Sequence, residues 1–189
     1  MRISGGSAKG RKVILKKAFA QKSDADELRP TSGKVREAIF NILGQRIADS
    51  RFLDLFAGTG AVGLEALGRG ASGTVFVDIS SHRVKLIRDL AAKFGLGERA
   101  VIAQSDALSF LRRNETPFDI IFADPPYASG DIAAVLPLLD SDDLLTPDGT
   151  IIVEHAKKTV MPERLEHSVL KKCYKYGDTM LSLYRKEPS

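Results

Sequence analysis

The run Phe52-Leu53-Asp54-Leu55-Phe56, followed by Ala57-Gly58-Thr59-Gly60, decides the fold of this chain. A short apolar run predicts a buried strand, and the glycines after it predict a tight turn. The small and apolar residues of 61–67 then begin a helix. A strand, a glycine turn and a helix make the first half of a βαβ unit, from which parallel sheets are built.

The same alternation of strand and helix continues toward the C-terminus. Further strands are expected at 73–77, 100–103, 118–123 and 150–154, with weaker candidates at 168–174 and 180–184. Further helices are expected at 35–43, 81–94, 107–111 and 131–139. Arg29-Pro30-Thr31-Ser32 supplies a proline break and an N-cap for the helix at 35–43. This alternation predicts a Rossmann-like α/β fold, a mostly parallel sheet with helices on both faces.

Length and composition limit the possibilities further. At 189 residues the chain is long enough for one domain, or for one domain with a small appendage. Its one cysteine, Cys173, cannot form an internal disulfide, so a reducing, cytoplasmic environment is expected. No Cys/His pairing suggests a metal site, no apolar stretch suggests a signal peptide, and no run reaches transmembrane length.

Positive charge is concentrated at the N-terminus. Residues 1–50 hold 11 Lys and Arg against 5 Asp and Glu, a net charge of +6, whereas the remainder holds 17 against 19, a net charge of −2. The Gly5–Gly6 pair predicts a tight turn, so 1–28 is expected to be a basic hairpin arm ahead of a domain at 29–189. Such an arm indicates contact with nucleic acid, although a solvated surface would explain it too. The candidate contacts to an RNA backbone are Arg11, Lys12, Arg29, Lys34 and Arg36.

Three glycines and an acid after the first strand indicate a nucleotide-like cofactor. Gly58, Gly60 and Gly63 fit the G-x-G-x-x-G pattern, and Asp78 follows 18 residues after Gly60. This pattern suits both NAD and S-adenosylmethionine, so a dehydrogenase is a rival interpretation. Asp54 favours S-adenosylmethionine, because a carboxylate before the turn would repel a pyrophosphate but can accept hydrogen bonds from the methionine ammonium.

Asp106 adds a third acid to this candidate cofactor site. It follows the third expected strand, where it is placed to accept a hydrogen bond from an adenine N6 amine; the alternative is a helix N-cap. Acids at the ends of three successive strands suit S-adenosylmethionine better than a dinucleotide. The candidate cofactor-binding residues are Asp54, Phe56, Gly58, Gly60, Asp78 and Asp106.

The strand at 118–123 leads into Asp124-Pro125-Pro126-Tyr127. The prolines end the strand and donate no N–H, so a carboxylate and fixed backbone carbonyls stand at the sheet edge where ligands bind. This combination suits the amino group of a flat base, on which Tyr127 can stack. The alternative is an ordinary strand-ending turn. The candidate catalytic residues are Asp124, Pro125, Pro126 and Tyr127, and their chemistry requires no metal.

With these motifs placed, the chain resembles the class I S-adenosylmethionine-dependent methyltransferases. More closely it resembles the RsmD family, which methylates N2 of one guanine in bacterial 16S ribosomal RNA. The segments that carry this resemblance run through the whole chain and include 2–11, 29–31, 35–43, 53–60, 63–71, 124–127 and 176–179. The Asp-Pro-Pro-Tyr tetrad is shared by many amino-methyltransferases, whereas the Arg-Pro-Thr helix and the extended glycine turn are more discriminating.

The resemblance implies a seven-stranded sheet with the last strand antiparallel, an N-terminal hairpin and S-adenosylmethionine as cofactor. It also implies 16S rRNA within an assembling 30S subunit as the substrate, and we expect a cytoplasmic monomer. Gly33 replaces an acid that the family usually has, and the loop at 16–28 is longer than usual. The nearest alternative is an adenine N6-methyltransferase acting on DNA or RNA; a non-catalytic RNA-binding assembly factor is the other.

Overall fold

The structure of the protein is a computed structural model that describes residues 32–126 and 131–187, so the expected hairpin arm at 1–28 lies outside the described residues. The helices are α1 (Gly33–Leu43), α2 (Ala61–Gly68), α3 (Ser81–Lys93), α4 (Ala107–Leu111) and α5 (Asp131–Leu139), with 3-10 turns η2 (Gly44–Ile47) and η3 (Gly97–Arg99). The strands are β1 (Arg51–Leu55), β2 (Gly73–Asp78), β3 (Ala100–Gln104), β4 (Phe118–Ala123), β5 (Leu145–Ala156), β6 (Ser168–Tyr176) and β7 (Thr179–Lys186). None of these helices has the length and apolar character needed to cross a membrane.

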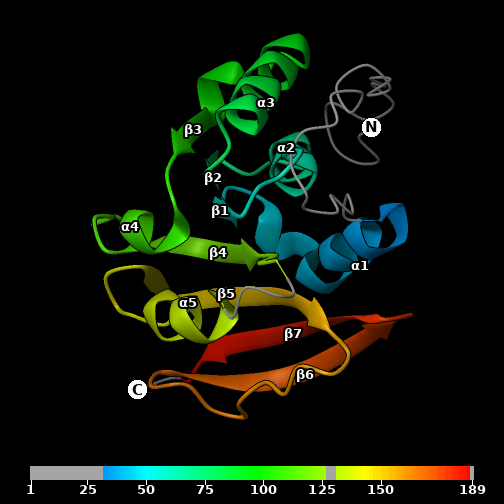
Figure 1. Cartoon of the computed structure of the whole chain (residues 1–189), viewed down its shortest axis with the longest axis vertical. Coiled ribbons are helices and arrows are strands. Elements are labelled where there is room, and N and C mark those ends of the chain that lie inside the picture. The colour runs from blue at the N-terminus through cyan, green and yellow to red at the C-terminus, as the bar shows by residue number, and fades with distance from the viewer. Residues whose placement is uncertain (1–31, 127–130, 188–189) are drawn as a thin grey trace.

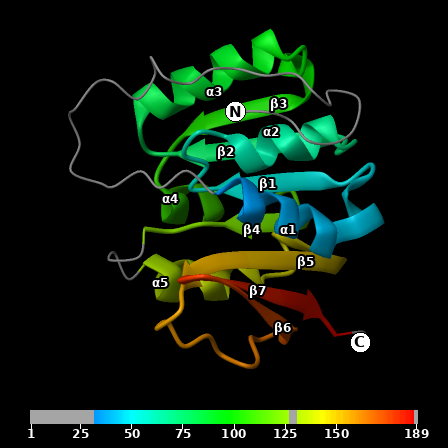
Figure 2. The ribbon, with the colours of Figure 1, turned by 90° about the vertical axis from the view of Figure 1, so that its right-hand side faces the viewer.

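All seven strands form one sheet in the order β3-β2-β1-β4-β5-β7-β6 (Figures 1 and 2). The strands from β3 to β5 in this order are parallel, whereas β7 is antiparallel to both β5 and β6. The expected seven-stranded sheet with an antiparallel last strand is therefore confirmed. The chain moves outward from β1 to β3 and then returns to place β4 beside β1. This reversal makes the carboxyl ends of β1 and β4 the expected ligand-binding position.

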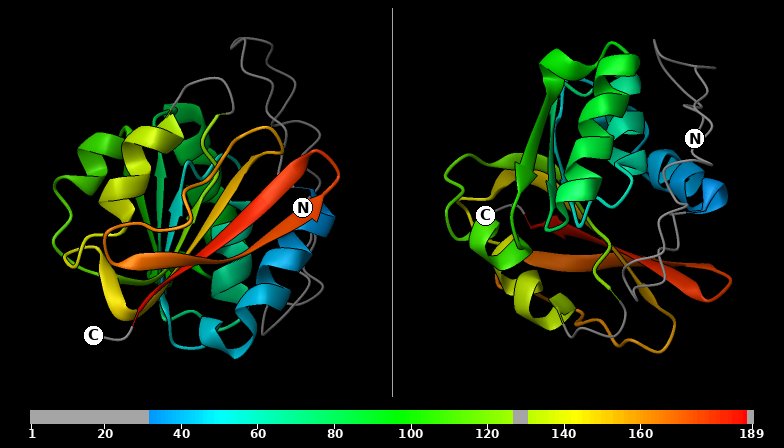
Figure 3. Two further views of the ribbon diagram at one scale, coloured as in Figure 1. Left: turned by 90° about the horizontal axis from the view of Figure 1, so that it is seen from below. Right: turned by 45° about the horizontal axis from the view of Figure 1, so that its top comes forward.

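Helices cover both faces of the sheet (Figure 3). Phe52 of β1 and Phe122 of β4 belong to the core beneath α1, α2 and α3. Leu53 and Ile121 belong to the core beneath α4 and α5. Because successive strand residues point to opposite faces, Asp54, two residues beyond Phe52, lies on the α1–α3 face.

The first helix forms as the sequence predicts. The Ser32 hydroxyl accepts a hydrogen bond from the Val35 amide at 3.2 Å, which satisfies one of the free amides at the helix start. Val35, Ile39 and Leu43 are buried at helical spacing and hold α1 against the sheet. Gly33 lies in the first turn, with no heavy atom within 4 Å of the Cβ that another residue would add. The cap therefore forms without the acid usual in the family at that position.

The fifth strand begins earlier than predicted. β5 starts at Leu145, so the turn expected at Asp148-Gly149 lies inside the strand. The pairing with β4 shifts register there: Phe118 is opposite Leu145, but Ile120 is opposite Thr150. The extra residues of β5 form an irregularity that keeps both flanking segments paired.

Candidate active site

Acidic side chains gather at the carboxyl edge of the sheet. Asp54 lies in β1, Asp78 ends β2, and Asp124 directly follows β4. The amide of Asp124 donates to the carbonyl of Leu55 at 3.4 Å, which continues the pairing of β4 with β1 past the end of the strand. Burial first, and then the charges of Asp124 and Asp78, raise the pKa of Asp54. The structure thus brings three of the predicted acids into one electrostatic environment.

The turn between β1 and α2 has a backbone conformation that favours glycine. Phe56, Gly58 and Gly60 have φ angles of 62°, 56° and 69°. A bulky residue such as phenylalanine in this region is strained by about 1–3 kcal/mol, and such strain concentrates at functional sites. A Cβ added to Gly58 would meet no heavy atom nearer than 3.9 Å, whereas one added to Gly60 would lie 2.9 Å from the Ile87 side chain. Gly58 therefore leaves open space for a ligand, and Gly60 allows close packing.

The third glycine of the pattern, Gly63, joins α2 to the sheet. A Cβ on Gly63 would overlap the Phe76 ring and lie 2.9 Å from Asp54 Oδ2. The amide of Gly63 donates to the same oxygen of Asp54 at 2.8 Å. Gly63 is thus needed because helix and strand approach too closely for a side chain.

Asp54 is a buried carboxyl with the properties expected of a cation partner. Only 1% of its surface is exposed, and burial raises its pKa well above its usual range, although the hydrogen bond from Gly63 lowers it. A positive group beside Asp54 would favour the ionised form and offset that burial. The ammonium of S-adenosylmethionine fits this requirement.

Asp78 fixes the glycine turn from the neighbouring strand. Its Oδ2 accepts a hydrogen bond from the Gly58 amide at 2.8 Å, and its Oδ1 accepts one from the Ser80 amide at 2.9 Å. Arg83 lies 3.7 Å from Oδ2. A carboxylate has about four acceptor positions, so Asp78 can still accept from a ribose hydroxyl. The next residue, Ile79, is 69% exposed and offers an apolar surface beside this carboxylate.

Asp106 caps a helix. Its Oδ1 accepts a hydrogen bond from the Ser109 amide at 2.9 Å at the start of α4, and hydrogen bonds from Ser109 lower its pKa. This is the alternative that the sequence left open, and the exposed Asp106 side chain is compatible with a second role. Its contact with adenine stays a prediction.

The predicted catalytic segment follows β4 without interruption. Asp124 is half-buried, Pro125 is buried and Pro126 is exposed, whereas Tyr127 lies outside the described residues. Burial raises the pKa of Asp124 to about 7. Near neutral pH this carboxyl can therefore exist in either protonation state, which is a property typical of functional carboxyls.

Sequence reasoning missed one acid at this edge, Glu154 of β5. Glu154 is 5% exposed, and burial and then the charge of Asp124 raise its pKa to about 8. Its Oε2 has no hydrogen-bond partner among the described residues. A signal was present, because Glu154 follows the apolar run 151–153, as Asp78 and Asp124 follow theirs.

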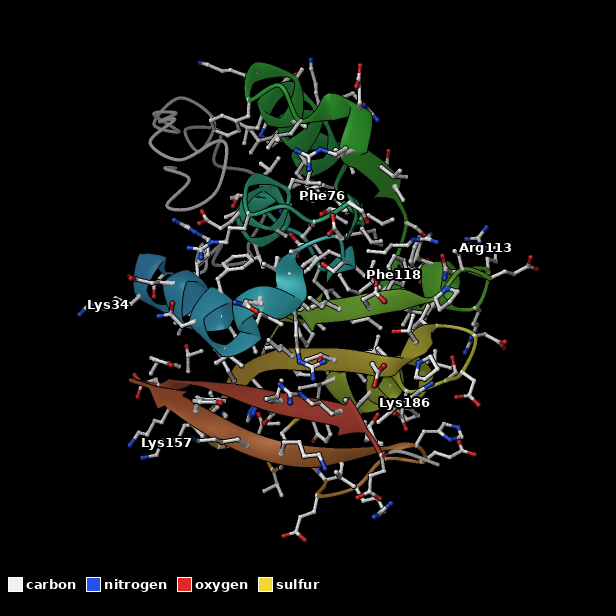
Figure 4. The ribbon with its side chains drawn as sticks, turned by 180° about the vertical axis from the view of Figure 1, so that it is seen from behind. Lys34, Phe76, Arg113, Phe118, Lys157 and Lys186 are labelled. Atoms are coloured by element: carbon white, nitrogen blue, oxygen red, sulfur yellow. The ribbon has the colours of Figure 1, made fainter. Side chains whose placement is uncertain are left out.

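Only part of the predicted basic surface can be described. Lys34 is exposed and points away from the body of the protein (Figure 4). The Arg36 side chain is 14% exposed, with its Nε 3.7 Å from Oε2 of the fully buried Glu65. Glu65 of α2 also accepts a hydrogen bond from Arg69 Nε at 2.9 Å. Because Arg36 lies in α1, its ion pair with Glu65 is placed to hold α1 against α2. The contact of Arg36 with RNA stays a prediction. Three further candidates lie outside the described residues: Arg11, Lys12 and Arg29.

Comparisons with known proteins agree with this architecture. The family model described as "Conserved hypothetical protein 95" matches residues 1–185. The "Putative rRNA methyltransferase YlbH" of Bacillus subtilis is 37% identical over 98% of this chain and 99% of its own length. The "Ribosomal RNA small subunit methyltransferase D" of Escherichia coli K12 is 35% identical over 99% of this chain and 90% of its own length.

A solved structure gives the same result in three dimensions. The "Putative methyltransferase yhhF from Escherichia coli" superimposes with a TM-score of 0.85 at 33% sequence identity. The alignment covers 100% of this chain and 99% of the solved chain. Motifs, sheet order and whole-chain similarity thus point to one family. The chain belongs to the family described as "Conserved hypothetical protein 95", the RsmD family.

Proposed function

We propose that this protein transfers the methyl group of S-adenosylmethionine to N2 of a guanine in 16S rRNA of the small ribosomal subunit. The observation that carries the proposal is the placement of Asp124 and the buried Pro125 beside the glycine turn of β1, at the point where the strand order reverses. The rRNA methyltransferase names of the B. subtilis and E. coli relatives, which match nearly the whole chain, support the same activity.

The residues around the glycine turn fit S-adenosylmethionine. Asp54 is a buried carboxyl suited to the ammonium, and Gly58 leaves open space above a turn with positive φ. Asp78 has acceptor capacity for the ribose hydroxyls, and the exposed Ile79 offers an apolar surface for the adenine ring. When bound, S-adenosylmethionine supplies an electrophilic methyl group on a sulfonium.

Asp124 and the carbonyl of Pro125 would orient the acceptor amine. The lone pair of guanine N2 is delocalised into the ring, which makes the amine a poor nucleophile. Two acceptors that take its two hydrogens favour tetrahedral geometry and direct the lone pair toward the methyl group. The N–C bond would form as the C–S bond breaks, the thioether S-adenosylhomocysteine would be the leaving group, and the Asp124 carboxylate would take the proton that N2 releases. Positioning and electrostatics thus provide most of the catalysis.

The state of Asp124 sets the pH dependence of this step. A protonated carboxyl donates one hydrogen bond and accepts less well than a carboxylate. Because the pKa of Asp124 is about 7, we expect kcat/KM to rise as the pH increases through about 7.

Basic residues would hold the RNA. Lys34 is exposed at the first turn of α1, and the sequence places Arg11, Lys12 and Arg29 before it. Each phosphate contact contributes about 0.7–0.9 to the slope of log K against log salt. We further propose that the protein acts as a monomer in the cytoplasm on assembling 30S particles, with Tyr127 stacked on the target base.

The proposal is tested by methyl transfer from labelled S-adenosylmethionine to undermethylated small-subunit particles, naked 16S rRNA and duplex DNA. The expected result is label on rRNA that digests to N2-methylguanosine, with particles preferred to naked RNA. Label on adenine or on DNA would overturn the proposed substrate. Binding of S-adenosylmethionine with no label in any of the three would overturn the catalytic role.

A further inference from the structure

Glu154 is a buried acid that the mechanism above does not use. It is 5% exposed, and its Oε2 has no hydrogen-bond partner within 32–126 and 131–187. An unpaired buried carboxyl is destabilising, so the fold alone gives no reason for it. Such a group is expected where a ligand supplies the missing partner.

Glu154 faces the same space as Asp124. Ala123 of β4 is paired with Val153 of β5, so the next residue of each strand lies side by side, about 4.8 Å apart. Phe122 and Ile152 both belong to the core under α1–α3, and strand alternation therefore places Asp124 and Glu154 on that same face. The charge of Asp124 also raises the pKa of Glu154, which agrees with their proximity.

The edge of guanine that carries N2 also carries a second donor. N1–H lies beside the amino group, so acceptors for N2 leave N1–H in need of its own partner. A carboxyl oxygen next to Asp124 is placed to accept from N1–H. N1–H of guanine would favour the ionised form of this carboxyl, which burial disfavours when no ligand is bound, whereas the ionised oxygen would face the lone pair of N1 in adenine, which is unfavourable.

We propose that Glu154 accepts a hydrogen bond from N1–H of the target guanine and thereby makes the acceptor pocket specific for guanine. This inference rests on the proposed function, since it assigns a specificity residue to the same reaction. Asp124 and the Pro125 carbonyl orient the amine that reacts, whereas Glu154 identifies the base that carries it. Discrimination of this kind is strong because the wrong base leaves a buried polar group unpaired.

A modified base separates this role from a structural one. 2-Aminopurine keeps the 2-amino group but has neither N1–H nor O6. Small subunits are reconstituted with either guanine or 2-aminopurine at the target position, and kcat/KM is measured for the wild type and for Glu154→Gln. Glutamine can accept from N1–H or donate to an unprotonated N1, so we expect the preference of the wild type for guanine to fall about tenfold in the variant. The missing O6 affects both enzymes equally and cancels in this comparison.

Two further variants complete the test. Glu163→Gln removes an exposed carboxyl from the segment between β5 and β6 and should leave the preference unchanged. Glu154→Asp keeps a carboxyl but withdraws it by one methylene, so the preference for guanine over 2-aminopurine should also fall. This variant provides a second measurement if Glu154→Gln folds poorly. An unchanged preference in folded Glu154 variants, even with lower overall rates, would overturn the inference. Absence of transfer to guanine by the wild type would overturn the proposed function instead, and this inference with it.

Discussion

The acids in the two halves of the candidate site differ in their hydrogen-bond partners. On the β1–β2 side, Asp54 accepts from the Gly63 amide and Asp78 accepts from the Gly58 and Ser80 amides. On the β4–β5 side, Glu154 has an oxygen without a partner among the described residues, and it lies beside Asp124. The first half is a hydrogen-bonded frame, and the second is a pair of carboxyls in a buried environment.

This difference indicates how binding energy is divided between the cofactor and the target base. Carboxylates that already hold backbone amides stabilise the turn and pre-organise it, so a cofactor can bind with little rearrangement. A buried carboxyl without such hydrogen bonds is stabilised in its ionised form only when a ligand brings donors or positive charge. We therefore expect the β1–β2 half to determine cofactor affinity and the β4–β5 half to determine reaction and base identity.

The largest effect is expected from Asp124→Ala. Without this acceptor the target amine is no longer oriented, so kcat should fall by about 10³-fold, while the Kd for S-adenosylmethionine changes by less than about threefold. Single-turnover transfer and calorimetric titration of the cofactor measure the two quantities. Asp143→Ala, at an exposed position, is the control and should change neither. Equal losses in cofactor binding and transfer would show that the two halves do not act separately.

The opposite pattern is expected from Asp78→Asn. The amide side chain can keep one of the two backbone bonds but loses charge and acceptor capacity, so the Kd for S-adenosylmethionine should rise by about 10- to 100-fold. At saturating cofactor, kcat should stay within a few-fold of the wild-type value. Asp89→Asn on the exposed face of α3 is the matched control. A lower kcat with unchanged cofactor affinity would contradict the division proposed here.

The frame was more predictable from the sequence than the carboxyl pair. The glycine turn, the Ser32 cap and the acids at strand ends depend on local pattern, which short segments of sequence contain. The partners of Arg36 and Glu154 depend on which elements become neighbours. Glu65 is 29 residues from Arg36 in sequence, and Asp124 meets Glu154 only because β4 and β5 pair.

The early start of β5 has a similar cause. Asp148-Gly149 is a strong local signal for a turn, and the sequence interpretation therefore began the fifth strand after it, at Thr150. In the structure, pairing of Leu145 with Phe118 continues the strand before it, and the turn residues become an irregularity within β5. Tertiary pairing thus overrides a correct local signal, as it does for many strands.

Rigidity of the frame can be tested at its glycines. Gly63→Ala places a methyl group against the Phe76 ring and Asp54, so we expect a loss of about 1–3 kcal/mol in the free energy of unfolding. Gly33→Ala is the matched change, because its added methyl meets nothing within 4 Å, and it should stabilise α1 by up to about 1 kcal/mol. Denaturant unfolding of both variants measures the difference. Equal stability of the two would show that α2 can move away from the sheet and that the frame is not rigid.

The stability of the carboxyl pair itself depends on pH. In the unfolded chain Glu154 loses its proton near pH 4.3, whereas the folded protein retains it up to a pKa of about 8. Between these values the native state binds more protons than the unfolded state, so this group makes the free energy of unfolding decrease as the pH rises. Glu154→Gln removes that titration. Its Tm should match that of the wild type at pH 5 and exceed it at pH 9, by thermal unfolding at both values. A variant less stable than the wild type at pH 9 would mean that the ionised Glu154 has a stabilising partner within the fold, and the contrast between the two halves of the site would not hold.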